Sequence, residues 1–192
     1  MPKRILGIDP GSRATGYAII EQHNTSYNVI ECSVLRMHKM DTHTERLQFI
    51  FDEISALIRE YHPDECAIET PVYGVDPLAM LKLGRAQAAA ILAITNEKLP
   101  VAEYYPKAVK KAIAGNGNAS KQQVAFMLHK VLQIDTDGLT GDATDALAVA
   151  WCHITNRGVP SGSATGKKMH QNNSKSSWAK FVEENPDRIK ES

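Results

Sequence analysis

The sequence predicts an α/β domain in which helices cover a mixed five-stranded sheet. Three β-branched and aromatic segments joined by short turns fill the first 36 residues, which favours an antiparallel meander. Beyond them, strand and helix patterns alternate along the chain, which indicates parallel crossover connections. The length of 192 residues and the apolar content of 43% suffice for one such domain with a tail.

The three strands of the meander are separated by turn residues. The first strand is a short apolar run that ends in Asp9, and Pro10, Gly11 and Ser12 supply the turn after it. A polar segment, residues 23–26, separates the second strand from the third. The expected strands are residues 4–9, 15–22 and 27–36.

Capping boxes predict where two of the helices begin. Thr42 and Glu45 form one box, and Ser120 and Gln123 form the other. Apolar residues at helical spacing follow each box. The alanine-rich segment 77–98 is apolar enough that we expect a largely buried helix. The expected elements after the meander are helix 44–61, strand 65–69, helix 77–98, strand 100–105, helix 106–114, a helix from the cap at 120 to 132, and helix 142–156.

The composition changes after Asn156. Residues 157–177 are rich in Gly, Ser, Asn and Lys, which is typical of a flexible linker. Residues 178–189 are long enough for one short helix, which would be stable only if it docked on the domain. We therefore expect a folded domain over residues 1–156 and a polar tail over residues 157–192.

Charge and apolar patterning exclude several classes of protein. The 22 basic and 22 acidic residues balance, which excludes a polybasic DNA binder but permits a local basic patch. Five lysines and one acid lie between residues 101 and 131. The longest uninterrupted apolar runs, 88–94 and 146–152, are shorter than a membrane helix, and the first residues lack a signal peptide's apolar core. Three scattered cysteines favour the reducing cytoplasm.

Four carboxylates stand at the ends of expected elements. Asp9 ends the first strand, Glu69 ends the fourth, and Asp142 and Asp145 share one face in the first turn of the last helix. If these ends meet at one edge of the sheet, the four acids repel one another unless cations lie between them. Oxygen ligands without a His or Cys cluster favour Mg²⁺. Two such ions about 3.5–4 Å apart can hold a phosphodiester, so the hypothesis is two-metal phosphodiester hydrolysis.

Each acid also has a structural explanation. Asp9 precedes Pro-Gly and suits a turn, while Asp142 and Asp145 suit a helix N-terminus because the macrodipole favours acids there. Glu69 is less easily explained, since a carboxylate that ends an apolar strand needs a partner. The combination of all four acids at these positions favours the functional interpretation.

Four motifs stand in order along the chain: Ile8-Asp9-Pro10-Gly11-Ser12 with Thr15-Gly16, Ala67-Ile68-Glu69, Leu81-Lys82-Leu83-Gly84 and Asp142-Ala143-Thr144-Asp145-Ala146-Leu147-Ala148. In their order and spacing they resemble the RuvC family of bacterial Holliday-junction resolvases over about residues 3–156. The resemblance implies an RNase H-like fold and a homodimer that nicks two opposing strands of a four-way junction in homologous recombination and DNA repair. It also implies that Asp9, Glu69, Asp142 and Asp145 are catalytic acids that bind two Mg²⁺ ions, with Mn²⁺ as a substitute, and that the RuvA–RuvB branch-migration complex is a partner.

The resemblance also implies basic residues that hold the DNA backbone. Lys110 and Lys121 match the family's positions before and after a glycine-rich loop, and Lys107 and Lys111 are neighbouring candidates. Lys121 follows an N-cap serine, where a cation opposes the helix dipole, so a phosphate is a plausible reason for its placement. Tyr73 is the candidate for base stacking, because Val72 stands where the family usually has an aromatic residue.

The alanine-rich helix has two interpretations. Its small residues permit close contact between helices, and the family dimerises near this position, so a dimer contact and an ordinary buried helix both suit the sequence.

Three other functions also suit parts of this sequence. Another RNase H-like nuclease acting on RNA or other branched DNA would have the same acids. An actin-like kinase or ATPase shares the Gly-Ile-Asp-x-Gly-Ser loop but needs two such domains, and the chain has room for one. An inactive junction-binding protein would not need all four acids. The preferred cutting sequence and the role of the tail do not follow from the sequence.

Overall fold

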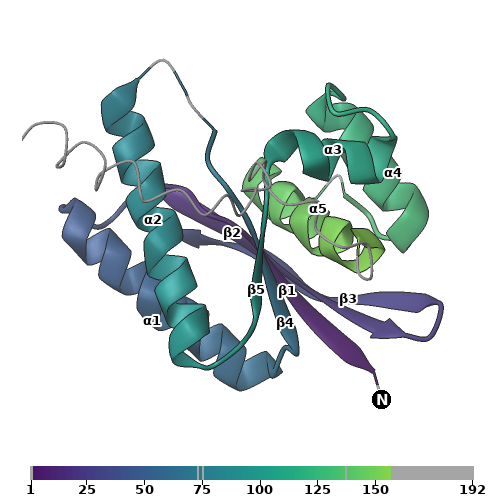
Figure 1. Ribbon diagram of the computed structural model, residues 1–192, viewed down its shortest axis with the longest axis horizontal. Coiled ribbons are helices and arrows are strands. Elements are labelled where there is room, and N and C mark those ends of the chain that lie inside the picture. The colour runs from purple at the N-terminus through teal and green to yellow at the C-terminus, as the bar shows by residue number, and fades with distance from the viewer. Residues whose placement is uncertain (1, 73, 75, 137, 157–192) are drawn as a thin grey trace, which may run out of the picture. The chain divides into compact units, whose positions relative to one another are not determined.

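The computed structural model describes residues 2–72, 74, 76–136 and 138–156, and the statements below concern these residues. A five-stranded sheet in the order β3-β2-β1-β4-β5 has helices on both faces (Figure 1). Helices α1 and α2 cover one face, and α5 with α3 and α4 covers the other. The bounds are β1 Lys3–Asp9, β2 Ala14–His23, β3 Ser26–Arg36, α1 His43–Tyr61, β4 Glu65–Glu69, α2 Pro77–Asn96, β5 Val101–Tyr104, α3 Pro106–Ala114, α4 Lys121–Leu132 and α5 Gly141–Asn156.

The sheet is mixed, as the sequence predicts. Strands β1, β2 and β3 are antiparallel neighbours, and β4 and β5 run parallel to β1. In register, Asp9 pairs with Gly16 on β2, and Ile8 pairs with Ile68 on β4. Asp9 and Glu69 therefore end neighbouring parallel strands at the same edge of the sheet.

Alternation along the strands divides the core between the two faces. Leu6, Ile8 and Ile68 are fully buried against α1 and α2, whereas Ile5 and Ala67 are buried against α5. Full burial of such a side chain is worth about 1.5–3 kcal/mol, so both faces hold the strands firmly in register. Because successive residues of a strand point to opposite faces, Asp9 and Glu69 belong to the α5 face.

Helix α5 lies very close to the sheet at its N-terminal end. A Cβ atom added to Gly16 would lie 1.9 Å from the carbonyl oxygen of Asp142, so only glycine permits this approach. Small buried residues on α5, among them Ala143 and Ala146, continue the close contact. The first turn of α5 is thereby held beside the end of β1.

Both predicted capping boxes are present. The Thr42 side chain accepts a hydrogen bond from the Glu45 backbone, and Ser120 does the same for Gln123, with the reciprocal bond made in each box. At its other end, α1 stops at His62, which adopts a left-handed conformation with φ 49°. The sequence therefore places these helix ends correctly.

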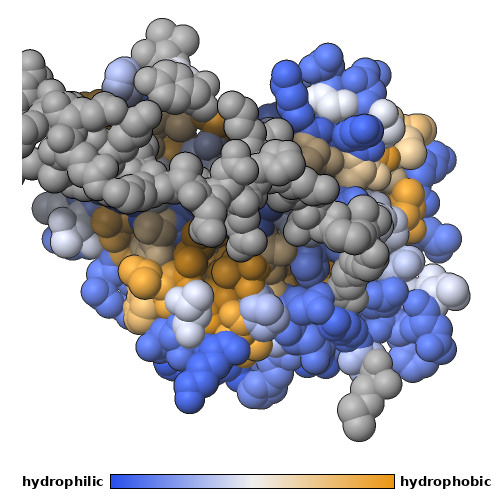
Figure 2. All heavy atoms as spheres, in the orientation of Figure 1, coloured by the Kyte–Doolittle hydropathy of each residue, from blue (hydrophilic) through white to orange (hydrophobic). Residues whose placement is uncertain are grey.

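Helix α2 differs from the prediction that it is largely buried. Only its alanine-lined face and Ile94 are buried, while Leu78, Leu81 and Leu92 are 59%, 50% and 60% exposed. The apolar composition thus includes a solvent-facing stripe, and Figure 2 shows apolar side chains gathered over the region of α2. By length and composition α2 is the one helix of the described residues that could cross a membrane, a test that core helices of soluble proteins also pass.

Two predicted features lie outside the described residues. They are Tyr73, the proposed stacking residue, and the tail over residues 157–192 with its short helix.

Candidate active site

Three of the four predicted acids line one pocket. Asp9, Glu69 and Asp142 contribute to a cavity of about 340 Å³ at the edge where β1 and β4 end and α5 begins. The remaining walls come from the segments after β1 and β4, from the second turn of α2 and from the first residue of α3. They are Pro10, Gly11, Pro71, Val72, Leu83 and Pro106.

The turn after Asp9 is closed by a buried threonine. The Thr15 hydroxyl donates a hydrogen bond to the Gly11 carbonyl oxygen at 3.2 Å, and the Gly11 N–H donates back to Thr15 Oγ1 at 3.4 Å. A Cβ on Gly11 would lie 2.0 Å from the Ala14 carbonyl oxygen, which explains the glycine. The motif around Asp9 therefore turns the chain tightly and leaves the carboxylate at the pocket.

Burial and mutual repulsion disfavour the charged forms of these acids. Burial, then the charges of Asp145 and Asp142, raises the pKa of Asp9 to about 7. Burial, then the charges of Asp9 and Asp145, raises the pKa of Glu69 to about 7. Asp145 thus belongs to the same electrostatic cluster even though it does not line the pocket. The cluster is short of positive charge.

Lys121 supplies part of the missing positive charge. Its Nζ lies 2.6 Å from Asp145 Oδ2, and this hydrogen bond raises the pKa of Lys121. Its charge also lowers the pKa of Asp9 and of Glu69. The lysine that opposes the dipole of α4 therefore has a carboxylate partner in this structure, which the sequence did not predict. Because the lysine side chain is 68% exposed, the pair is worth at most about 1 kcal/mol.

The donor set of the cluster fits a hard divalent cation. All four donors are carboxylates on strand ends or the first turns of one helix, and two of them resist ionisation without a nearby cation. As the side chains stand, no three His, Cys, Asp or Glu residues in the described part of the chain are arranged to hold an ion. One oxygen of Asp145 is held by Lys121 in the ion pair.

The predicted DNA-binding lysines lie on α3 and at the start of α4. Lys110 is half-buried and lowers the pKa of Glu69, so its charge acts on the pocket. Lys107 and Lys111 are exposed on the same helix, whose first residue, Pro106, lines the pocket. The basic segment of the sequence therefore flanks the acids on the β4 side.

A hydrogen-bonded group beside Glu69 was missed by the sequence analysis. Gln87 Nε2 on α2 donates to Glu103 Oε2 at 2.8 Å and to Thr70 Oγ1 at 3.3 Å, and the Thr70 hydroxyl donates to Glu103 at 3.2 Å. These contacts join α2, β5 and the residue after Glu69. Nothing in the spacing of the three residues indicates the contact, because it depends on how α2 crosses the sheet.

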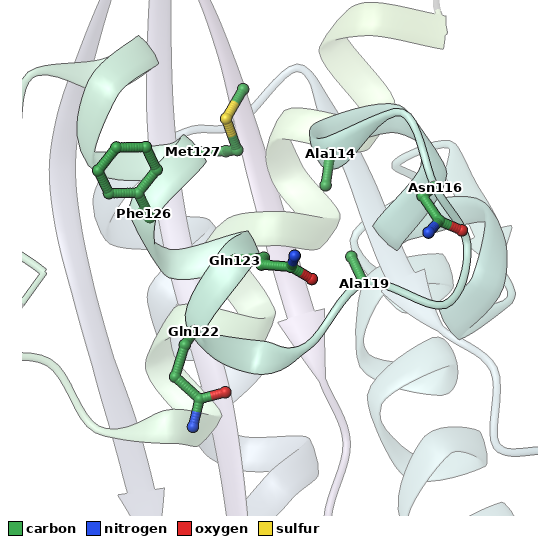
Figure 3. A pocket seen from close by; sticks show the side chains of 7 residues that line it. All are labelled: Ala114, Asn116, Ala119, Gln122, Gln123, Phe126 and Met127. Carbon is green, nitrogen blue, oxygen red and sulfur yellow. The ribbon is translucent and has the colours of Figure 1, made fainter.

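A larger pocket of about 500 Å³ lies between α3 and α4 (Figure 3). Its lining is apolar or amide and contains no titratable side chain, so it offers no comparable chemistry; the residues are Ala114, Asn116, Ala119, Gln122, Gln123, Phe126 and Met127.

Comparisons with known proteins identify the family. The sequence profile described as crossover junction endodeoxyribonuclease RuvC matches residues 5–153. The crossover junction endodeoxyribonuclease RuvC of Salinibacter ruber is 46% identical over 97% of this chain and 99% of its own length. The enzyme of the same name from Cytophaga hutchinsonii is 45% identical over 97% of this chain and 88% of its own length.

Solved structures agree with the sequence comparison. The Thermus thermophilus RuvC in complex with Holliday junction substrate has a TM-score of 0.74 at 26% identity, over 80% of this chain and 93% of that chain. The yeast mitochondrial Holliday junction resolvase shares the fold, with a TM-score of 0.63 at 16% identity over 80% of this chain and 79% of that chain. The predicted resemblance is confirmed: the chain has an RNase H-like fold and belongs to the RuvC family of crossover junction endodeoxyribonucleases.

Proposed function

We propose that this protein resolves four-way DNA junctions by paired, symmetric nicks, in homologous recombination and DNA repair. The observation that carries the proposal is the pocket that Asp9, Glu69 and Asp142 line, with Asp145 electrostatically coupled to it. Membership of the RuvC family supports the substrate, since the Thermus thermophilus relative is described with a Holliday junction.

Nucleases of this family are metal-dependent. We assign Asp9, Glu69, Asp142 and Asp145 as the residues that hold two Mg²⁺ ions, with Mn²⁺ as a substitute. When bound, such ions activate water and stabilise the leaving oxygen of a phosphodiester. Hydrolysis in line would leave a 5′-phosphate and a 3′-hydroxyl.

The chain's own residues would orient the substrate around these acids. The cations Lys110 and Lys121 lie near enough to affect the pKa of Glu69, so each is placed to donate hydrogen bonds to phosphate oxygens beside the cut. Lys107 and Lys111 on α3 would extend the contact along the backbone, and Tyr73 would stack on a base near the junction centre. Such contacts select the shape of the junction before its sequence.

Symmetric nicking requires two active sites, and α2 offers the surface that would bring them together. Leu78, Leu81 and Leu92 share one helical face and are half-exposed or more. A stripe of this kind is unusual on a monomer and suits an isologous contact between two copies. We therefore propose a homodimer through α2 in which each protomer cuts one strand.

The proposal includes a cellular setting. We propose that the enzyme acts in the cytoplasm with the RuvA–RuvB branch-migration complex, which moves the junction until it can be cut. The free thiols of Cys32, Cys66 and Cys152 suit a reducing compartment.

Incubation with a synthetic four-way junction and with linear duplex of the same sequence, each with and without Mg²⁺, tests the function. We expect paired nicks in the junction only, and only with metal. Asp9→Asn and Glu69→Gln should abolish cutting and keep junction binding in EDTA. Asp52→Asn, which changes an exposed carboxylate on α1, is the matched control and should cut normally.

Other outcomes would decide against the proposal. Equal cutting of duplex, RNA–DNA hybrid and junction would instead favour a general RNase H-like nuclease. Junction binding without cutting in the wild type would favour an inactive binding protein.

A further inference from the structure

A second group of cations lies at the same edge of the sheet, on the other side of the acids. Arg13 precedes β2, Arg36 ends β3 and Lys39 follows it, and all three are exposed. Within the described residues, no ion pair or hydrogen bond engages their charged groups. The flanking segments, residues 10–18 and 32–40, contain no acid. We call Arg13, Arg36 and Lys39 the β3-side basic surface.

The backbone brings two of these residues together. Arg36 pairs with Ala14 in the β2–β3 ladder, and the Met37 N–H donates a hydrogen bond to the Arg13 carbonyl oxygen at 3.0 Å. The loop after β1 and the loop after β3 are therefore joined, although they are more than twenty residues apart in the sequence.

Arg36 points to the face that carries the acids. Its neighbour Leu35 is buried in the core against α1 and α2, so Arg36 belongs to the opposite face, that of α5. In agreement, Arg36 lines a small pocket of about 120 Å³ with Thr140 and Ala143 at the start of α5. Arg36 and the acids thus flank the same first turn.

The sheet register sets the distance between Arg36 and the cut site. Asp9 pairs with Gly16, and Gly16 pairs with Val34, so Arg36 lies two strands across and two residues further along. With about 4.8 Å between strands and about 3.4 Å per residue, its backbone is roughly 12 Å from that of Asp9. Phosphates along one strand of a duplex rise about 3.4 Å each along the helix axis and also wind around it, so this distance spans about two to three nucleotides.

We propose that the β3-side basic surface binds the phosphate backbone of the DNA arm about two to three nucleotides from the cut, opposite the arm held by α3 and α4. The inference rests on the proposed function, because it places the cut phosphate at the acids. Without this surface, the phosphates of DNA on the β3 side would approach the four acids with no basic side chains beside them. With it, the backbone crosses the edge of the sheet with positive charge on both sides of the acids.

Equilibrium binding of a fluorescent four-way junction in EDTA, measured over a range of salt concentrations, tests the proposal. Each phosphate contact contributes about 0.9 to the slope of log affinity against log salt. Arg36→Gln should reduce that slope by about 0.9, and the triple change Arg13→Gln, Arg36→Gln, Lys39→Gln by roughly 2.7. Arg36→Lys, which keeps the charge, should keep the slope.

The matched control is Arg59→Gln, which removes an exposed arginine at the C-terminal end of α1. The Arg59 side chain is 64% exposed and pairs with Glu97, outside every part of the proposed DNA surface. This variant should bind with the wild-type slope. If Arg36→Gln matches Arg59→Gln in slope and affinity, the proposal is overturned.

Replacing one charged phosphate at a time with a neutral linkage shows which phosphate the β3-side basic surface contacts. Single methylphosphonate linkages, placed one to five nucleotides on either side of the nick, should weaken wild-type binding most at about two to three nucleotides on one side. Arg36→Gln should be insensitive at that position, and equal sensitivity of both proteins would contradict the assignment. Failure of the wild type to prefer the junction over duplex would refute the proposed function instead, so the two failures are distinguishable.

Discussion

Lys121 and Asp145 form an ion pair where the proposed metal ions need a carboxylate. The ammonium group neutralises one acid and lowers the pKa of two others, so it partly replaces the missing cations. If Asp145 holds a metal ion through the same oxygen, the ion would displace Lys121 and free its Nζ for a phosphate. Loading of the site and engagement of the DNA would therefore be coupled through one side chain.

Replacing Lys121 with methionine should tighten metal binding. Removal of the competing ammonium leaves Asp145 without its partner, and an exposed pair of this kind is worth up to about 1 kcal/mol, or about fivefold in affinity. Titration calorimetry of DNA-free protein with Mg²⁺ and with Mn²⁺ measures the change. Lys111→Met is the control, and weaker metal binding by the Lys121 variant would contradict the displacement.

The metal-free protein should lose stability as the pH rises through 7. The pKa of Asp9 and of Glu69 is about 7 in the folded protein and near 4 in an unfolded chain. Their stabilising contribution is therefore fully present below about pH 4 and is lost between pH 4 and pH 7 and just above. Thermal melting in EDTA of the double variant Asp9→Asn, Glu69→Gln isolates this effect.

The double variant should melt above the wild type by about 3 °C or more at pH 8, with little difference at about pH 4. Asp52→Asn should show no such pH dependence. A gain of equal size at both pH values would mean that repulsion between the acids is not the cause.

At the scale of elements, residues close in the sequence determine where most helices and strands begin and end, and contacts between distant elements determine the rest. The boxes at Thr42 and Ser120 fix their helices because each cap satisfies backbone groups within four residues. The exposed stripe of α2 could not be predicted, because the apolar content of the segment does not show whether Leu81 and Leu92 face the core or solvent. The acids were predictable from strand and helix ends, but the partners of Lys121 and Gln87 depend on contacts between distant elements.

Gly16→Ala should damage the protein more than an ordinary glycine substitution. The added Cβ would lie 1.9 Å from the Asp142 carbonyl oxygen and would push the first turn of α5 away from the sheet. We expect the free energy of unfolding to fall by about 3 kcal/mol. We also expect the molecules that remain folded to cut junctions more slowly. Denaturant unfolding and single-turnover cutting measure the two effects.

Gly84→Ala on α2 is the matched control, because nothing lies within 4 Å of its added Cβ. Alanine there should stabilise the helix by about 0.5–1 kcal/mol. Similar behaviour of the two variants would show that the close approach of α5 is not required.

At the scale of the whole molecule, the exposed stripe on α2 should decide the oligomeric state. The double variant Leu81→Gln, Leu92→Gln removes two exposed leucines without opening the core, so we expect folded monomers where the wild type is dimeric. Light scattering after size-exclusion chromatography measures the mass. Phe126→Gln on α4, which is 58% exposed, is the control and should leave the dimer intact.

The monomeric variant should also nick junctions one strand at a time. Closed-circular cruciform DNA distinguishes the outcomes, because paired nicks linearise the circle and single nicks only relax it. A dimer that persists in the leucine variant would place the contact elsewhere.

The alternation that sends Asp9 and Glu69 to one face also limits how the chain can change in length. Inserting or deleting a single residue between Gly7 and Asp9, or between Ala67 and Glu69, would turn a carboxylate toward α1 and α2. The loops at residues 24–25 and 115–118 lie between elements, so a change in their length does not alter the alternation of β1 or β4. Evolution and engineering can therefore change the length of these two loops without turning a carboxylate away from the site, while the last three residues of β1 and β4 must keep their count.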